Sequence, residues 1–325
     1  MKDIAKTIRS VARSVAGRVP PAREVLLERD RLRREVARLR GAVGDPADAP
    51  QFVPPGHFYS ALPSLAQVAR RADRIFGPPP RTLPGIDLRE QAQLELVRSW
   101  QSFYDEQPFP RTRTGARRYW FENGAYSYSD ALFLYFVLRH VRPKRVLEIG
   151  SGHSSCVTLD TNELFFDGAV ACTFVEPYPD LLRSLLKEGD ADRITILASD
   201  VQVVDRSVFE ELEAGDVLFI DSTHVSKVGS DVNYLLLDVL PRIAPGVYVH
   251  FHDVFYPFEY PRRWIEEGRA WSEAYLLRAF LAFNGAFEIV VFNTFLEHFH
   301  REFFARQLPL CLENPGGSLW LRRVA

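Results

Sequence analysis

The chain has 325 residues, with 40 lysines and arginines against 42 aspartates and glutamates and a net charge of -2. Its composition, 46% hydrophobic and 25% charged, is that of a globular protein and excludes the disordered, collagen-like and disulfide-scaffold classes. The balanced charge provides no chain-wide basic surface, so we expect no nucleic-acid partner. The length predicts one large domain or two small ones.

The cysteines and the apolar runs indicate where the protein resides. Cys156, Cys172 and Cys311 are widely spaced and form no CxxC pair, which is typical of reduced thiols. No apolar run reaches the roughly 20 residues of a membrane span, and the first residues lack the apolar core of a signal peptide. We therefore expect a cytoplasmic protein without a transmembrane segment.

The first 43 residues form a basic region of their own. They carry a net charge of +7 and the remaining residues carry -9. Residues 2–16 have apolar side chains at helical spacing, and about three heptads follow between Val25 and Val43. These helices could pack on their own domain, join two copies as a homodimer, or bind a membrane surface. Residues 44–57, rich in glycine and proline, predict a linker.

The rest of the chain divides into two parts. Residues 58–141 have a mainly helical pattern and predict a helical cap. From residue 142 to 325, short apolar runs alternate with amphipathic helices, which predicts an α/β fold with a mostly parallel sheet covered on both faces. The seven expected strands are residues 145–149, 171–175, 194–198, 217–220, 247–251, 287–292 and 318–322. Residues 293–315 predict only a loop, so the last two strands are expected to pair antiparallel.

A glycine-rich loop follows the first expected strand directly. The sequence Gly150-Ser-Gly-His-Ser-Ser155 leads from this strand into a helix. Small residues let a ligand approach the backbone, and the start of the helix supplies free amides. Glu148, an acid inside an apolar strand, predicts a cationic or hydrogen-bonding partner. Glu176 ends the next strand 24 residues after Gly152, the offset at which an acid accepts ribose hydroxyls, and Asp200 follows the third strand near an expected adenine.

This loop departs from the dinucleotide pattern of dehydrogenases, because Ser154 takes the third glycine position and Glu148 precedes the loop. The stretch from Glu148 to Ser154, with Glu176 and Asp200, resembles the S-adenosylmethionine site of class I methyltransferases. The resemblance implies a Rossmann-like seven-stranded sheet with an antiparallel last strand in a domain spanning residues 142–325. It also implies that the first acid and the loop hold the amino-acid end of S-adenosylmethionine and that the second acid holds the ribose. The implied cofactor-binding residues are Glu148, Gly150, Ser151, Gly152, His153, Ser154, Glu176, Pro177, Asp200 and Val201.

Acidic and histidine side chains end the fourth and fifth expected strands. Asp221 follows one strand, and His252 and Asp253 follow the other, on the same sheet edge as the glycine loop. This pattern resembles the metal-dependent small-molecule O-methyltransferases of the catechol and natural-product sugar type. The resemblance implies Mg²⁺ or Mn²⁺ bound by Asp221, His252 and Asp253, although His252 stands where the family has an acid or amide and leaves the metal's identity open. The alternative is that Asp253 caps a turn over His252.

Two further sets of residues concern the reaction. His224 lies at the position where the catechol enzymes carry a catalytic lysine, so we expect it to act as a base beside Asp221. His250 is expected to be a buried strand residue. Aromatic residues gather in 255–261 and 271–275, and they either form a substrate wall or merely cover the sheet edge. The expected substrate-binding residues are Tyr256, Glu259, Trp264 and Arg278.

Together these patterns predict an S-adenosylmethionine-dependent methyltransferase that methylates a hydroxyl group of a small molecule with the help of a divalent metal. Two alternatives remain. One is metal-free O- or N-methylation on the same fold, with the strand-end residues acting as hydrogen-bond partners. The other is a non-catalytic cofactor-binding scaffold recruited through its N-terminal helices.

Overall fold

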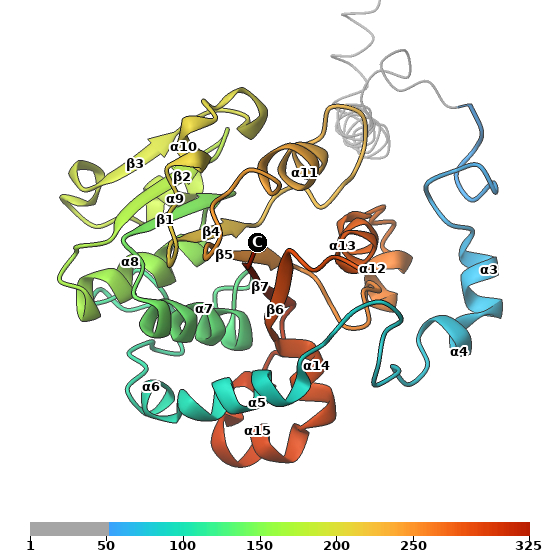
Figure 1. Ribbon diagram of the computed structural model, residues 1–325, viewed down its shortest axis with the longest axis horizontal. Coiled ribbons are helices and arrows are strands. Elements are labelled where there is room, and N and C mark those ends of the chain that lie inside the picture. The colour runs from blue at the N-terminus through green and yellow to red at the C-terminus, as the bar shows by residue number, and fades with distance from the viewer. Residues whose placement is uncertain (1–51) are drawn as a thin grey trace, which may run out of the picture. The chain divides into compact units, whose positions relative to one another are not determined.

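The computed structural model describes residues 52–325, and the chain divides after Pro63, so that residues 52–63 and Ser64–Ala325 belong to two separate units (Figure 1). The described part of the first unit is a run of turns in which the ring of Phe58 contacts those of His57 and Tyr59, with centroids 4.2 and 4.3 Å apart. The predicted N-terminal helices, and the homodimer that would depend on their heptads, lie outside the described residues. The predicted domain boundaries at residues 43, 57 and 141 stay predictions.

The second unit is built on one seven-stranded sheet, in the order β3-β2-β1-β4-β5-β7-β6. The first five strands in this order are parallel, and β7 runs antiparallel to both β5 and β6. The predicted α/β fold and its antiparallel last strand are confirmed, and each strand begins within one residue of its expected position. The strands are β1 (Arg145–Ile149), β2 (Ala171–Val175), β3 (Ile194–Leu197), β4 (Val217–Ile220), β5 (Tyr248–His252), β6 (Phe287–Phe292) and β7 (Ser318–Arg323).

Helices α7 (Tyr128–Val141) and α8 (His153–Phe165) pack against each other beside the sheet (Figure 1). The apolar run 131–138 in α7 is fully buried and forms part of the hydrophobic core. Within residues 52–325 no helix has the length and apolar character needed to cross a membrane. The other helices up to β6 are α3 (Leu65–Arg70), α4 (Ala72–Ile75), α5 (Glu90–Ser99), α6 (Gln101–Asp105), α9 (Asp180–Leu185), η1 (Asp190–Asp192), η2 (Val201–Val203), α10 (Ser207–Glu210), α11 (Asp231–Asn233), the π-helix η3 (Tyr234–Val239), α12 (Arg262–Glu266) and α13 (Glu273–Leu281).

The connection between β6 and β7 is helical, and the prediction of a loop over residues 293–315 was wrong. It contains α14 (Asn293–Phe299), α15 (Arg301–Gln307) and the 3₁₀ turn η4 (Pro309–Leu312). These elements bury apolar side chains spaced for helices, including Phe295, Leu296 and Phe304. Each helix is only seven residues long, so neither shows the extended periodicity by which a helix is recognised in a sequence.

Backbone hydrogen bonds tie together the loops at the carboxyl ends of the parallel strands. The amide of Gly150 donates to Val175 at 2.9 Å, and the amide of Asp221 donates to Ile149 at 2.8 Å. The amide of Glu176 donates to Leu197 at 3.0 Å. The ends of β1 to β4 are therefore fixed relative to one another, at the edge where doubly wound sheets bind ligands.

Candidate functional site

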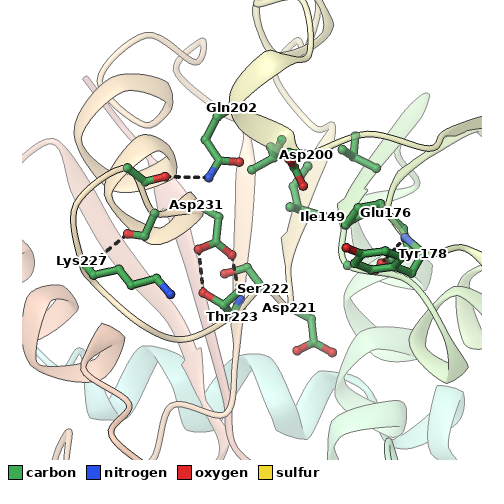
Figure 2. Close-up of a pocket in the computed structure, with 16 residues that line it drawn as sticks. Ile149, Glu176, Tyr178, Asp200, Gln202, Asp221, Ser222, Thr223, Lys227 and Asp231 are labelled. Atoms are coloured by element: carbon green, nitrogen blue, oxygen red, sulfur yellow. Dashed lines mark hydrogen bonds between the residues drawn. The ribbon is translucent and has the colours of Figure 1, made fainter. Parts of the chain in front are cut away.

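A cavity of about 380 Å³ opens at this edge of the sheet, within the size range of small-molecule sites (Figure 2). Its walls come from the loops after β1, β2, β3 and β4 and from the start of α11. The sequence-predicted residues that line it are Gly150, Glu176, Pro177, Asp200, Val201 and Asp221. The structure thus brings five of the predicted cofactor-binding residues, together with Asp221, into one cavity.

The glycine loop passes very close to the end of β4. Gly150 has a φ of 80°, and a Cβ atom there would lie 1.8 Å from the carbonyl oxygen of Asp221. Only glycine fits at this position, because any side chain would collide with backbone that cannot move aside. Gly152 immediately precedes α8, so the loop delivers the chain directly into the start of that helix.

Glu148 lies behind the glycine loop and is fully buried. Its Oε1 accepts hydrogen bonds from the hydroxyls of Ser154 at 2.6 Å and Ser155 at 2.9 Å, while its Oε2 has no partner. Burial raises the pKa of Glu148 to about 8, although the two hydroxyl groups act in the opposite direction. Ser154, at the third glycine position, is thus a hydrogen-bond partner of this acid.

Glu176 is held in the cavity wall by backbone amides. Its Oε1 accepts from the amide of Tyr178 at 2.9 Å and its Oε2 from the amide of Ser151 at 3.3 Å. A fixed carboxylate that retains free lone pairs suits a pair of ligand hydroxyl groups. Across the cavity, the side chain of Gln202 donates to the carbonyl of Gly229 at 2.9 Å and joins η2 to the loop after β4 (Figure 2).

His224 is the centre of a buried charged cluster beside the cavity residue Asp221. Its Nδ1 lies 2.9 Å from Glu273 Oε2, and its Nε2 lies 3.4 Å from Asp221 Oδ1 and 3.8 Å from Asp253 Oδ2. Burial disfavours a charged ring, but hydrogen bonds to Asp221 and Glu273 outweigh burial and raise the pKa of His224 to about 10. The ring of Trp271 also contacts that of His224, with centroids 4.4 Å apart.

The start of α13 fixes the backbone of His224. Its carbonyl accepts from the amides of Ser272 at 2.9 Å and Glu273 at 3.1 Å, and its own φ is 60°. Sequence reasoning missed Glu273 altogether. An acid in the first turn of a helix is common for electrostatic reasons, so its position carried no signal of a long-range contact.

Comparisons with known proteins agree with this geometry. A family described as "Methyltransferase domain" matches residues 147–254. An uncharacterized protein of Archaeoglobus fulgidus is 36% identical over 170 residues, which are 50% of this chain and 75% of that protein. The chain therefore belongs to the same family as this archaeal protein, and residues 147–254 match a methyltransferase domain. The strand order and the cavity at the carboxyl edge of the sheet fit a methyltransferase domain.

Two solved methyltransferases are similar to this chain at low sequence identity. A Podospora anserina methyltransferase bound to SAH is 15% identical, with a TM-score of 0.41 and coverage of 85% of this chain and 99% of that one. The O-methyltransferase TomG from Streptomyces achromogenes, involved in tomaymycin synthesis and solved with SAM, is 14% identical, with a TM-score of 0.39 and coverage of 72% and 90%.

The predicted metal ligands lie close to a third side chain. His252 Nε2 lies 3.5 Å from Asp253 Oδ1, and the Nε2 of His224 lies within 3.8 Å of both Asp221 and Asp253. Over residues 52–325 no group of three or more histidine, cysteine, aspartate or glutamate side chains is arranged to hold a metal. The predicted Mg²⁺ or Mn²⁺ site is therefore not confirmed.

The predicted substrate-binding residues have different surroundings, and one of them lies beside His224. Trp264 packs edge-on against Trp271 at 5.0 Å and so belongs to the aromatic wall beside His224. Tyr256 is instead buried, with its hydroxyl bonded to the carbonyl of Pro80 and its ring against Phe295, which is a packing role. Glu259 bonds to the hydroxyl of Tyr275, and Arg278 lies exposed on α13. His250 is buried against Phe219, as expected of a strand residue.

Proposed function

We propose that this enzyme transfers a methyl group from S-adenosylmethionine to a hydroxyl oxygen of a small molecule. The observation that carries the proposal is the arrangement at one sheet edge of a fixed carboxylate, Glu176, and a buried histidine cluster around His224. The carboxylate of Glu176 suits the hydroxyl groups of a ribose, and the cluster around His224 suits a substrate hydroxyl group that must lose a proton.

The cofactor would lie across the cavity. Glu176 would accept hydrogen bonds from the ribose hydroxyls, and Asp200 and Val201 would border the adenine. The loop from Gly150 to Ser154 would hold the amino-acid end. The bound sulfonium supplies the reactive methyl group, so the protein's part in the transfer is mainly to align the two reactants.

His224 is the residue we assign to the substrate proton. Glu273 accepts a hydrogen bond at Nδ1, which leaves Nε2 of the neutral ring to take the proton of the hydroxyl group. Asp221 and Asp253 then stabilise the imidazolium that forms. Because the pKa of His224 lies near 10, the ring is mostly a cation at neutral pH, and the proton transfer uses the minor neutral form, which is the stronger base.

The first test is calorimetric titration with S-adenosylmethionine and, in parallel, with NAD. We expect S-adenosylmethionine to bind and NAD not to bind. Glu176→Gln should weaken binding of S-adenosylmethionine by about 10- to 100-fold, because a charged acceptor is lost. Glu188→Gln is the matched control, since Glu188 is an exposed acid outside the cavity. Failure of the wild type to bind S-adenosylmethionine would refute the cofactor assignment.

The second test follows methyl transfer from labelled S-adenosylmethionine to a panel of phenols and sugars. His224→Gln should lower kcat by about 100-fold or more and leave binding of S-adenosylmethionine unchanged. EDTA should not alter turnover, because the ring of His224 lies near both carboxylates and can compensate their charge. Loss of turnover in EDTA that Mg²⁺ or Mn²⁺ restores would favour the metal-assisted mechanism instead. Deletion of residues 1–43 separates the enzyme from the scaffold alternative. An enzyme without these residues should keep its turnover, whereas a scaffold recruited through its N-terminal helices would no longer associate with its partner or membrane.

A further inference from the structure

Asp130 is a buried acid in the first turn of α7. Its Oδ1 accepts hydrogen bonds from the amide of Gly317 at 2.9 Å and from the hydroxyl of Ser318 at 2.6 Å. Acids in the first turn of a helix usually interact with its free amides, whereas this carboxylate is bonded to the start of β7. The two bonds therefore join α7 to a strand that lies beside β5 in the sheet.

Gly317 connects Asp130 to the turn that follows β5. Its amide donates to Asp130, and its carbonyl accepts from the amide of Val254 at 3.1 Å. A Cβ atom on Gly317 would lie 3.1 Å from Cα of Asp253 and 2.8 Å from Cζ of Phe255, so the two segments are in direct contact. Because no side chain stands between them, a shift of Gly317 must move the turn as well.

The turn after β5 places the carboxylate of Asp253 beside His224. Asp253 has a φ of 55°, in the left-handed region that residues other than glycine rarely adopt. Its Oδ2 lies 3.8 Å from His224 Nε2. Surrounding contacts must hold such a backbone conformation, and the bond from Val254 to Gly317 is immediately next to it.

The cofactor cavity is held by other contacts. The amide of Asp221 donates to Ile149, and the amide of Gly150 donates to Val175. Neither bond involves β7, so a displacement of the turn after β5 should leave the cavity unchanged. Asp130 can therefore influence the reaction without influencing cofactor binding.

We propose that Asp130 is a positioning residue for methyl transfer: it fixes Gly317, and through it the turn that carries Asp253. This keeps the Asp253 carboxylate beside His224. The inference rests on the proposed function, in which Asp253 stabilises the imidazolium that forms when His224 takes the substrate proton. Without the carboxylate of Asp130, the amide of Gly317 and the hydroxyl of Ser318 would lose their acceptor, and the turn could move away from the ring. A misplacement of about 1 Å near the reacting atoms can cost up to about 100-fold in rate.

The first arm measures methyl transfer from labelled S-adenosylmethionine to an acceptor that the wild type methylates. Asp130→Ala should lower kcat by about tenfold and leave the Kd for S-adenosylmethionine within about twofold of the wild type. Asp130→Asn should restore most of kcat, because its amide oxygen can still accept from Gly317 and Ser318. Glu297→Gln is the matched control and should leave kcat unchanged. Glu297 is also a buried acid, but in the part of the chain that the structure describes its side chain bonds to Ser129 and not to β7.

A double-mutant cycle tests whether Asp130 acts through Asp253. Asp253→Asn should lower kcat, and Asp130→Ala should lower it no further once Asp253 is replaced. If the two losses multiply instead, Asp130 acts by another route and the proposal is overturned. Equal losses in Asp130→Ala and Glu297→Gln, or in Asp130→Ala and Asp130→Asn, would overturn it too. If Asp130→Ala does not fold, Asp130→Ser takes its place in the cycle, because the shorter side chain does not reach both donors.

Hydrogen exchange tests the same link without activity. In Asp130→Ala the amide of Val254 should exchange at least about tenfold faster than in the wild type, and in Glu297→Gln it should exchange at the wild-type rate. An unchanged Val254 rate in Asp130→Ala would contradict the proposal. If the wild type transfers no methyl group, the proposed function fails and the role in catalysis with it, while the exchange rates still decide whether Asp130 fixes the turn.

Discussion

Replacement of Glu148 by glutamine tests whether the acid behind the glycine loop is protonated in the folded protein. Burial raises its pKa to about 8 from an ordinary value of 4.5. Folding therefore takes up a proton between these two values, and stability falls as the pH rises from about 4.5 to about 8 and then levels off. At about 1.4 kcal/mol per pH unit, this interval sets an upper limit of about 5 kcal/mol on the loss.

Glutamine has the shape of the protonated acid and no charge to bury. Glu148→Gln should therefore match the wild type at pH 5 and exceed it in free energy of unfolding at pH 8 by up to a few kcal/mol. Urea unfolding from pH 5 to 9 measures the difference, with the exposed Glu188→Gln as the control that should show none. A variant that is less stable than the wild type at pH 8 would refute the reasoning, because it would show that the carboxylate form is needed.

Three further predictions concern the glycine loop, the buried Arg118 and the aromatic wall. Gly150→Ala should reduce binding of S-adenosylmethionine by more than about tenfold in calorimetry, because its Cβ would meet the carbonyl of Asp221. Arg118→Leu should lower the free energy of unfolding in urea by about 3–5 kcal/mol, since it removes the guanidinium that pairs with buried Asp160 at 2.8 Å. Trp271→Ala should lower kcat by about tenfold with cofactor binding unchanged, because it frees the ring of His224.

The fold could be predicted from sequence wherever burial is strong and local. The strand β4 is an unbroken apolar run and β1 is apolar apart from Arg145 and Glu148, and both were predicted at their observed limits. The glycine loop could be predicted because only glycine tolerates the close approach of this loop to the end of β4. A steric requirement of this kind appears in the sequence as a glycine. The helices α14 and α15 could not, because each is too short to show a period.

The missed features all depend on contacts between distant parts of the chain. Glu273 bonds to His224 from 49 residues away, and the sequence contains nothing that distinguishes it from an ordinary first-turn acid. Arg113 and Arg118 look alike in sequence, yet the fold buries Arg118 among acids and places Arg113 over the ring of Trp120. Charge compensation is a property of the folded surroundings, so it could be identified only from the structure.

The cluster around His224 shows why strand-end residues alone do not define a reaction. Asp221 and Asp253 stand where the sequence predicted them, at neighbouring strand ends, and two carboxylates in such a place suit a divalent ion. The start of α13 changes this outcome, because Glu273 and two backbone amides hold His224 so that its Nε2 faces both carboxylates. A cationic ring can compensate the same charges that a metal would. The chemistry of this edge is therefore decided by a helix that follows the strands, through contacts that only the folded chain creates.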